Sequence, residues 1–424
     1  MITTLILILM ALLGVPLFVV IVSAAIVGFY QAEIDLVAVI IEFYRLAEMP
    51  ILLAIPLFSF AGYLLSESQA PKRLVAFTEA FLGWAPGGLA MVSILACALL
   101  TALTGASGVT IVALGALLYP AMAQAGYKEN FNLGLITSAG SLGLLFAPAL
   151  PLILYAIIAQ QLNVGGKPFT LDDMFLAGIL PGLLMIVMLV IWSYWKNRHQ
   201  ARTSFSWDKA REAMWQAKWE LPLPFIILGG IYSGYFAISE AAAVTALYVL
   251  LIEVFVLKEI TLKRLPDITR DSMILVGGIL IILGVSLAST NVLIDGGIPN
   301  KIFAVISAHV TDKLTFLTLL LLFLLLLGAI LDIFSALVLM VPLLLPIAIG
   351  YGIDPVHFGI IFLATMQLGY FTPPVGMNLF IASYRFNKPV MQLYQATLPF
   401  FFILLLSVLI ITYWPALSLG LSGR

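Results

Sequence analysis

The sequence predicts an all-α polytopic membrane protein: an inverted structural repeat with two re-entrant helical hairpins and two broken transmembrane helices. Of its 424 residues, 62% are hydrophobic and only 10% are charged, a much smaller charged share than soluble domains have. The apolar runs are long enough for helices to cross a bilayer, which argues against a β-barrel. Two of these runs are interrupted by glycine and proline at corresponding positions of two halves, a pattern that marks the binding site of many transporters.

The composition also narrows the function. A net charge of −1 gives no indication of nucleic acid as a partner, and the single cysteine, Cys97, excludes an internal disulfide. With three histidines, no cysteine–histidine metal site is visible, and no cofactor is expected. The chain also lacks an ATP-binding loop and a dense set of intramembrane acidic residues and histidines. A membrane enzyme is therefore disfavoured relative to a transporter embedded in the lipid bilayer.

The first repeat begins with a retained membrane helix at Met1–Tyr30, whose apolar run is too long for a cleaved signal peptide. In Gln31–Met49 charged and apolar residues alternate, which indicates an amphipathic helix lying along the interface. Pro50–Ser66 is the second span. A second amphipathic segment runs from Ala70 to Trp84 and ends at the turn Ala85–Gly88.

The first hairpin is predicted at residues 89–124, some 36 residues without a charge. One helix of that length would greatly exceed a hydrocarbon core of ~30 Å. The middle reads Thr104-Gly-Ala-Ser-Gly-Val-Thr110, which is weakly polar and carries no interfacial charge. We therefore favour a helix–turn–helix that enters and leaves on the same side. Two short complete spans are the alternative.

The first broken helix is predicted at residues 131–161, with its interruption between Gly140 and Pro148. Proline supplies no N–H and disfavours helix at the preceding residue, and glycine tolerates conformations that other residues avoid. Lipid cannot satisfy the freed backbone groups, so such a break must be buried in protein or line a polar cavity. An ordinary proline kink is the alternative. Met174–Trp195 then completes the first repeat, residues 1–195.

A basic linker at residues 196–220 separates the halves. It is the only long hydrophilic segment, and we expect a solvated linker on the cytoplasmic side. Its basic residues are Lys196, Arg198, Arg202, Lys209, Arg211 and Lys218.

The second repeat, residues 221–424, is predicted to follow a similar order. Glu240 lies beside Ser239 near one end of a span, where helix capping is its favoured role. The predicted segments are spans at Leu221–Gly234 and Phe236–Leu257, an interfacial helix at Lys258–Asp271, a span at Ser272–Leu293, an amphipathic piece from Ile298 to Asp312, and a last span from about Val390 to Leu417.

A second hairpin at residues 314–350 and a second broken helix at 356–384 match the first pair. A shift of about 225 residues places Ser107 on Asp332 and Pro148 on Pro373, so hairpin tip matches hairpin tip and break matches break. The second break contains two adjacent prolines, Pro373 and Pro374, between glycines. Matched breaks of this kind predict a substrate site between the halves.

The basic residues predict the orientation. With the linker on the cytoplasmic side and both hairpins re-entrant, 15 basic residues lie inside and five outside. The two repeats then have opposite orientations in the membrane. The five outer residues are Arg45, Lys167, Lys301, Lys313 and Arg424.

Four segments, in order along nearly the whole chain, carry a family resemblance. They are Phe175-Leu-Ala-Gly-Ile-Leu-Pro-Gly-Leu183, Ser239-Glu-Ala-Ala-Ala-Val244, Asp354-Pro-Val-His-Phe-Gly-Ile360 and Thr372-Pro-Pro-Val-Gly-Met-Asn-Leu-Phe380. With them the chain resembles the large membrane subunit of the tripartite ATP-independent periplasmic (TRAP) transporters. One departure is that Ala147 precedes Pro148, where the family often has two adjacent prolines.

The resemblance implies sodium-driven uptake of an organic acid across a bacterial or archaeal inner membrane. It also implies a soluble periplasmic substrate-binding protein, a small four-helix membrane subunit, and a scaffold with a transport domain that moves like an elevator. Because the large-subunit pattern begins at Met1, we expect the small subunit to be a separate chain. A stand-alone sodium- or proton-coupled dicarboxylate transporter or antiporter of related fold is the alternative. No arginine within a predicted membrane segment is placed to bind a substrate carboxylate, so dicarboxylates, keto acids and sialic acid all stay open as substrates.

Ion and substrate sites are expected where the hairpin tips meet the breaks. Freed carbonyls offer sodium hard oxygen ligands, and half-helix N-termini suit a substrate carboxylate. The residues expected at the first ion site are Thr104, Gly105, Ser107, Gly108, Gly140, Ser141 and Gly143, and those at the second are Asp332, Ser335, Gly369 and Thr372. The residues expected around the substrate are Ser107, Thr110, Pro148, Pro373, Pro374, Gly376 and Asn378.

Asp332 has two interpretations. An intramembrane carboxylate is a candidate for a functional site. The same side chain can cap the returning helix of the hairpin by accepting N–H bonds from Ser335 or its neighbour. The two roles are compatible, and both stay open.

Overall fold

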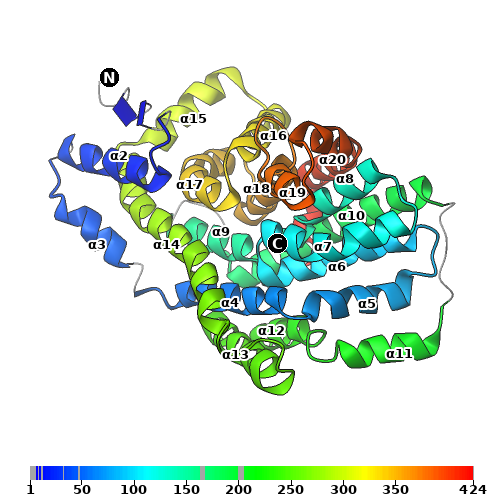
Figure 1. The fold of residues 1–424 in the computed structure, drawn as a ribbon. Coiled ribbons are helices and arrows are strands. Elements are labelled where there is room, and N and C mark those ends of the chain that lie inside the picture. Colours follow the sequence, from blue (N-terminus) through cyan, green and yellow to red (C-terminus); the bar gives the residue numbers. More distant parts are fainter. Residues whose placement is uncertain are drawn as a thin grey trace.

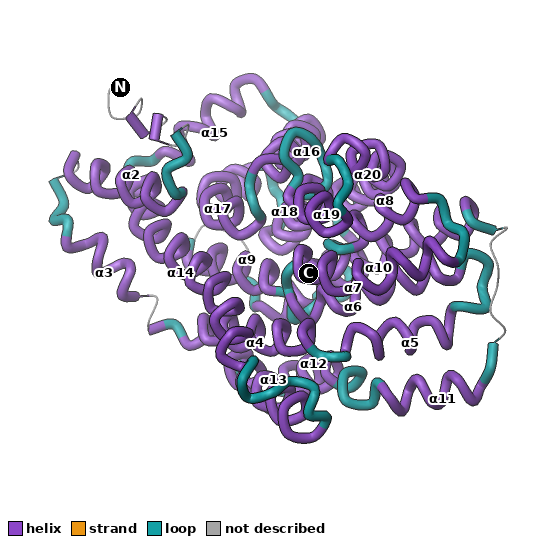
Figure 2. The backbone as a smooth tube through the Cα atoms, in the orientation of Figure 1, coloured by secondary structure: helices purple, strands orange, loops and turns teal. Residues whose placement is uncertain are grey.

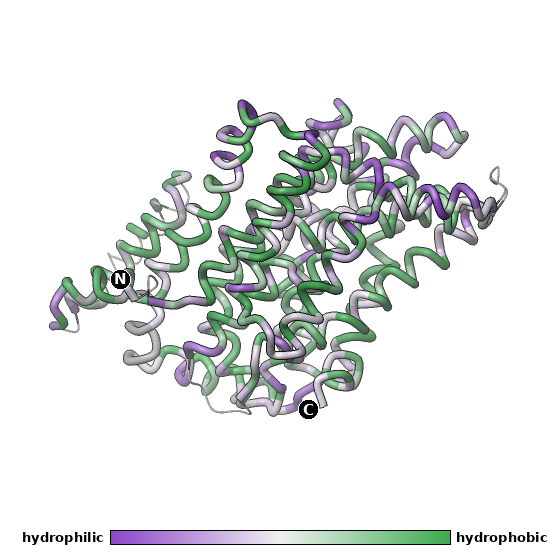
Figure 3. Tube along the Cα trace, turned by 90° about the horizontal axis from the view of Figure 1, so that it is seen from below, coloured by the Kyte–Doolittle hydropathy of each residue, from purple (hydrophilic) through white to green (hydrophobic). Residues whose placement is uncertain are grey.

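The fold is helical throughout the part of the chain that the structure describes, which confirms the all-α prediction (Figures 1 and 2). The structure is a computed structural model that describes residues 6–7, 9–10, 13–31, 33–45, 48–162, 168–198 and 205–423. By length and composition, eight helices among these residues could each cross a membrane. Apolar residues follow the helix bodies, whereas many hydrophilic residues gather at the ends of the bundle (Figure 3).

The described helices of the first half follow the predicted order, and residues 1–5, 8, 11 and 12 of the predicted span Met1–Tyr30 lie outside the described residues. The helices are α2 Leu17–Gln31, α3 Val37–Arg45, the short η2 Pro50–Leu53, α4 Ala54–Glu67, α5 Ala70–Leu82, the hairpin pair α6 Gly88–Thr104 and α7 Ser107–Gln124, the broken pair α8 Glu129–Ala139 and α9 Leu150–Gln161 with the turn η3 Leu142–Leu145 between them, and α10 Leu171–Lys196.

From α14 on, the second half has an order of elements similar to that of the first half from α4 on. Its helices are α12 Leu223–Tyr232, α13 Ile238–Leu250 with its π-helical continuation η4 Leu251–Val256, α14 Leu265–Asp295, α15 Ile298–His309, the hairpin pair α16 Lys313–Ile330 and α17 Ile333–Gly350, the broken pair α18 Pro355–Gly369 and α19 Met377–Phe386, α20 Val390–Tyr413 and the short α21 Ala416–Leu419.

One prediction in this half is wrong. A separate interfacial helix at Lys258–Asp271 does not form, because residues 265–271 are the first turns of the 31-residue helix α14. Pro266 lies in the first turn, where proline is tolerated, and no helix breaker follows before the apolar body. The predicted cap is confirmed, since the Glu240 carboxylate accepts the Ala237 N–H at 2.9 Å.

The linker is also more than solvated chain. Residues Trp207–Gln216 form the helix α11, which packs alongside α5 (Figure 1). Its Ala210 and Ala213 side chains are buried. The linker therefore places an ordered helix beside the amphipathic helix that leads into the first hairpin.

The helices of the two halves pack crosswise. In the outer group, α4 packs against α13 and α14 packs against α2. In the inner group, α7 of the first hairpin packs against α19, and α17 of the second hairpin packs against α9. Helices α7 and α17 are each 18 residues long and begin 226 residues apart, at Ser107 and Ile333. Each half therefore completes its packing on the corresponding elements of the other.

A buried ion network joins α5 to the outer group. The Arg73 guanidinium lies 2.5 Å from Glu220 and 3.4 Å from Glu253, and it also pairs with Glu259. The side chains of Glu220 and Glu253 are each 1% exposed. Burial raises the pKa of Glu220, while Arg73 acts in the opposite direction. The network fixes the start of α5 to the turn before α12 and to the chain after α13.

Loss of the arginine is expected to destabilise the protein strongly. In Arg73→Gln the buried glutamates lose their only cationic partner in the network, and breaking a buried pair in this way costs about 3–5 kcal/mol. Arg264→Gln is the matched control, because Arg264 pairs with Glu67 at 3.8 Å on the exposed surface, where a pair contributes at most ~1 kcal/mol. Denaturant titration in mixed micelles measures both free energies of unfolding. Equal effects of the two substitutions would contradict the buried network.

Candidate functional site

The first helix break is enclosed by protein. Helix α8 ends at Ala139, and the chain bends by 43° before α9 continues from Leu150. Residues 140–145 are buried, so the backbone groups freed by the break lie away from lipid. The Ala147–Pro148 peptide bond within it is cis. The predicted broken helix at 131–161 therefore corresponds to the pair α8 and α9.

The tip of the first hairpin lies against this break. Gly105 and Ala106 connect α6 to α7, and Gly105 has a left-handed φ of +66°, which glycine adopts readily. A Cβ atom on Gly105 would lie 2.7 Å from the Cγ of Leu150, at the start of α9. One turn earlier, the Thr101 hydroxyl donates to the Gly140 carbonyl at 2.8 Å. The hairpin thus binds one of the carbonyls at the break.

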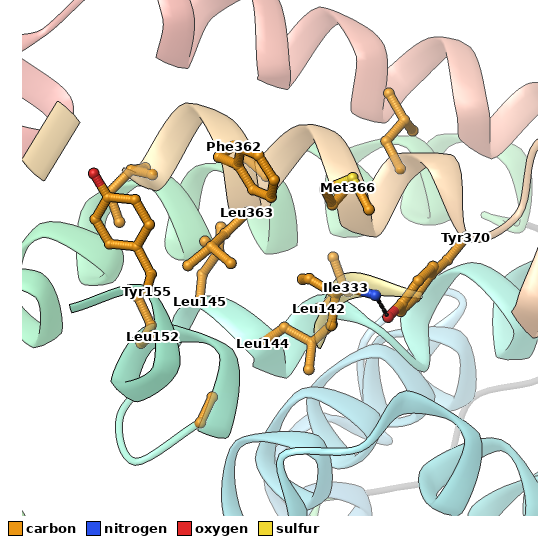
Figure 4. Close-up of a cluster of buried hydrophobic side chains, with 14 of the residues drawn as sticks. Leu142, Leu144, Leu145, Leu152, Tyr155, Ile333, Phe362, Leu363, Met366 and Tyr370 are labelled. Carbon is orange, nitrogen blue, oxygen red and sulfur yellow. Dashed lines mark hydrogen bonds between the residues drawn. The ribbon is translucent and has the colours of Figure 1, made fainter. Parts of the chain in front are cut away.

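The second hairpin meets the second break in a corresponding way. The Ala329 carbonyl accepts the N–H groups of Val375 and Gly376 at 3.2 and 2.9 Å. The Tyr370 hydroxyl, just beyond the end of α18, accepts the Ile333 N–H at the start of α17 at 2.7 Å (Figure 4). Backbone groups of the break and the tip are therefore satisfied by one another.

Close backbone contact at each junction depends on a glycine. A Cβ atom on Gly143 would lie 2.3 Å from the Ala102 nitrogen, and one on Gly369 would lie 2.6 Å from the Gly328 backbone. Gly143 and Gly369 are 226 residues apart, as are Ala102 and Gly328. Both junctions are thus built from the same pair of positions in the two halves.

The two breaks also contact each other. The Ser107 hydroxyl donates to the Asn378 side-chain carbonyl at 2.8 Å, and the Asn378 amide lies 3.4 Å from the Thr137 carbonyl. The Ser141 hydroxyl lies 3.4 Å from the Gln367 carbonyl. In Figure 4, Leu145 of η3 lies beside Leu363 of α18. The structure therefore brings residues of both breaks and of the first tip into one cluster.

Asp332 caps a helix, as one of its two interpretations predicts. One carboxylate oxygen accepts the N–H groups of Phe334 and Ser335 at 2.9 and 3.0 Å, and the other accepts the Ser335 hydroxyl. Thr372 donates its hydroxyl to the Gly369 carbonyl at 2.8 Å.

The predicted site residues differ in exposure. Pro373 and Pro374 are exposed and Thr372, Gly108 and Asp332 are partly buried. The Thr110 hydroxyl faces into the hairpin, where it lies 2.7 Å from the Thr101 hydroxyl. The second break is therefore open to the surface and the first is enclosed. The buried members are Thr104, Gly105, Ser107, Thr110, Gly140, Ser141, Gly143, Pro148, Ser335, Gly369, Gly376 and Asn378.

The sequence of the chain matches a known family over almost its whole length. The profile of the tripartite ATP-independent periplasmic transporter, DctM component, matches residues 4–417. The chain belongs to this family. It is thus a TRAP transporter large permease, an integral protein of the inner membrane and not an enzyme.

Relatives of this TRAP permease have different named substrates. It is 33% identical to the isethionate TRAP transporter permease protein DctMQ of Oleidesulfovibrio alaskensis, a match that covers 94% of this chain and 62% of the relative. It is 34% identical to the C4-dicarboxylate large permease DctM of Pseudomonas aeruginosa, with 90% and 88% of the two chains covered. The ectoine/5-hydroxyectoine permease of Ruegeria pomeroyi is 29% identical, over 98% of this chain and 96% of that one.

The fold of the TRAP permease is similar to that of a solved transporter. The YdaH transporter of Alcanivorax borkumensis aligns with a TM-score of 0.64 at 16% sequence identity. The alignment covers 90% of this chain and 88% of that one.

The sequence alone did not identify three polar residues of the junctions. Thr101 lies one helical turn before Thr104, and that i, i+3 spacing on an apolar helix is a signal that could have found it. Tyr370 and Gln367 precede the second break, where only their position was a cue. Gln367 is buried with no hydrogen-bond partner for its side-chain oxygen among the described residues.

Adding a methyl group at the second junction is expected to destabilise it. In Gly369→Ala the new Cβ would force apart the backbones of α18 and α16, a form of overpacking that costs about 1–3 kcal/mol. The matched control is Gly278→Ala in α14, where no atom lies within 4 Å and alanine favours the helix by roughly 1 kcal/mol. Denaturant titration should give a lower free energy of unfolding for Gly369→Ala than for the wild type, and a higher one for Gly278→Ala. A neutral Gly369→Ala would show that the contact does not require glycine.

Proposed function

We propose that this TRAP permease carries a small organic anion inward, driven by sodium and by elevator-type movement of one helix group. Its proposed partners are a soluble periplasmic substrate-binding protein and a small four-helix membrane subunit. One observation carries the proposal: each hairpin tip shares backbone or side-chain hydrogen bonds with a helix break, so two equivalent junctions flank one cluster. In membrane transporters, broken helices of this kind form substrate and ion sites.

The proposal includes an inverted repeat with halves at 1–195 and 221–424. The crosswise packing of α4 on α13 and of α2 on α14 supports it, because each half contacts the other through equivalent elements. The ion pairs support the predicted orientation, because they join residues assigned to one membrane face. Lys388, assigned inside, pairs with Glu129 beside Lys128, and Arg73 pairs with Glu259 beside Lys258.

The proposed scaffold consists of α2–α4 and α12–α14, and the proposed transport domain consists of the hairpins, the broken helices, α10 and α20. Helices α5 and α15 connect the two groups along the chain. The shared hydrogen bonds at each junction support movement of hairpins and breaks as one unit, since separation would leave backbone groups unsatisfied in a lipid environment.

The proposed first ion site is at the enclosed junction. Thr104, Ser107 and Ser141 place hydroxyl groups there, and the Gly140 carbonyl lies within reach of a hairpin hydroxyl. Sodium at such a site would be held by hydroxyl and carbonyl oxygens. Among the described residues no group of three or more His, Cys, Asp and Glu side chains is placed to hold a metal ion. Gly105, Gly108 and Gly143 would contribute through their backbone.

The proposed second ion site is at the open junction. Among the residues that the structure describes, Asp332 is the one acidic side chain at this junction, and its capping bonds hold the carboxylate in place. It would act on a sodium ion through its charge. Ser335, Gly369 and Thr372 would supply a hydroxyl, a carbonyl and a second hydroxyl.

The substrate is proposed to bind between the two tips, beside Ser107, Asn378 and the exposed Pro373 and Pro374. Helix α19 begins beyond Gly376 with its positive end at this place, which suits an anionic group. Isethionate and C4-dicarboxylates, for which two relatives are named, are both organic anions. Thr110 and Pro148 are buried and would shape the site from behind.

Sodium binding tests the ion sites without knowledge of the substrate. Sodium should raise the thermal unfolding midpoint of the purified protein relative to choline. Asp332→Asn keeps the shape of the cap but removes the charge, and the sodium concentration for half of the effect should rise several-fold. Thr372→Ala should shift it in the same direction.

Asp312→Asn is the control for capping alone. Asp312 accepts the Thr315 N–H at 2.8 Å at the exposed start of α16, outside the proposed site. It should lose at most ~1 kcal/mol of stability and keep the wild-type sodium response. An unchanged sodium response in both Asp332→Asn and Thr372→Ala would remove the second ion site from the proposal.

Uptake assays test the proposed partners. Proteoliposomes with this chain and its small subunit should accumulate a labelled organic acid only when the matching binding protein and a sodium gradient are present. Strong uptake without the binding protein would favour the alternative, a stand-alone dicarboxylate transporter or antiporter. Equal uptake when a proton gradient is applied in place of the sodium gradient would contradict sodium coupling.

A further inference from the structure

Helix α11 presents three different faces. At 3.6 residues per turn, its residues fall into three arcs centred about 120° apart. One arc holds Trp207, Met214 and Trp215, a second holds Asp208, Glu212 and Gln216, and the third consists of alanines. A helix that only links two spans through water needs a single polar surface, so the apolar arc requires an explanation.

The alanine arc packs on the protein. Ala210, Ala213 and Ala217 are buried, and α11 lies along α5. This contact fixes the rotation of α11 and leaves the other two arcs exposed, with Glu212 and Gln216 at the rim of a hollow between α11 and α5. Figure 1 shows α11 and α5 side by side.

The apolar arc is uncovered among the described residues. The exposed fractions of Trp207, Met214 and Trp215 are 67%, 43% and 69%. Exposed aromatic side chains of this size are typical of the interfacial zone of a bilayer. Trp84 at the end of α5 and Trp195 at the end of α10 are also exposed, at 51% and 72%. Trp84 lines a hollow with Phe205 and Lys209, and Asn197, two residues after Trp195, lies beside Gly87, so both of these tryptophans lie near the start of α11.

Two basic residues, Arg211 and Lys218, lie at the same arc. Residues 196–218 contain six lysines and arginines but only two acidic residues. Arg211 is exposed within the apolar arc, and the Lys218 ammonium lies 3.9 Å from the centre of the Trp215 ring. Long basic side chains beside tryptophans can reach anionic headgroups while their stems stay on apolar surface.

We infer that α11 lies in the headgroup layer of the cytoplasmic leaflet, with Trp207, Met214 and Trp215 toward the acyl chains and Arg211 and Lys218 on anionic phospholipid headgroups. The occupant of this face is bilayer lipid. The polar arc with Asp208, Glu212 and Gln216 then faces the cytoplasm, so the three arcs match protein, lipid and water. Because α11 packs on α5, the lipid contact also holds the helix that leads into the first hairpin.

Spin labels on two positions of α11 test the inference. In a Cys97→Ser background, Met214→Cys and Gln216→Cys each receive a nitroxide, and the protein is placed in nanodiscs of phosphatidylcholine with phosphatidylglycerol. Position 214 should collide several-fold more with oxygen, which concentrates in the acyl chains, than with a water-soluble nickel chelate. Position 216, the matched control on the polar arc, should show the reverse order.

Charge reversal tests the headgroup contact. Arg211→Glu combined with Lys218→Glu should reduce the preference of position 214 for oxygen, since each basic residue contributes about fivefold to binding at an anionic surface. The reduction should be smaller in nanodiscs of phosphatidylcholine alone. High nickel access at both positions would place α11 in water, and exclusion of both probes from position 214 would show that a protein partner covers this face. Either result would overturn the inference.

Discussion

Every backbone group freed by a broken helix at membrane depth must find a partner in protein, because lipid offers none. In this TRAP permease several of the partners come from the hairpins, and Tyr394 of α20 supplies another by donating to the Pro374 carbonyl. The Ala329 carbonyl binds two N–H groups beyond Pro374, the Tyr370 hydroxyl binds the first N–H of α17, and Thr101 binds the Gly140 carbonyl. The hairpins and the broken helices therefore satisfy part of each other's hydrogen-bonding groups.

This hydrogen bonding explains where small residues are required. Hydrogen bonds between two backbones need the helices to approach more closely than larger side chains allow. Gly143 against Ala102 and Gly369 against Gly328 provide that approach at positions that correspond in the two halves. The remaining contacts of the junctions differ, since Ser107 binds Asn378 whereas Asp332 caps its own helix. The two junctions thus share a backbone plan and have different side-chain chemistry.

The sequence was most informative where local chemistry decides the structure. Prolines and glycines predicted where the helices are interrupted, and long apolar runs with a polar centre predicted the helix pairs α6–α7 and α16–α17, because these features act within a few residues of one another. It was least informative where contacts between distant segments decide the structure. The charged residues 265–271 suggested a separate helix, but they form the first turns of α14. Helix α11 forms where α5 offers it a packing surface. Gln367 became part of the site because the fold brings it to Ser141 of the other half, and Tyr370 because the second hairpin folds back onto its own break.

The Arg73 network has a mechanical consequence. It anchors the first turn of α5 to the helices α12–α14 through three glutamates on separate parts of the chain. Any displacement of the first hairpin relative to those helices must therefore be absorbed beyond Arg73, by rotation of a helix about 20 Å long and by the turn that contains Gly87 with its φ of +69°. Helix α15, which leads into the other hairpin, buries only Pro299 among its side chains. The helix that leads into the first hairpin, α5, is thus held by buried ion pairs, whereas the helix that leads into the second, α15, is held by few buried contacts.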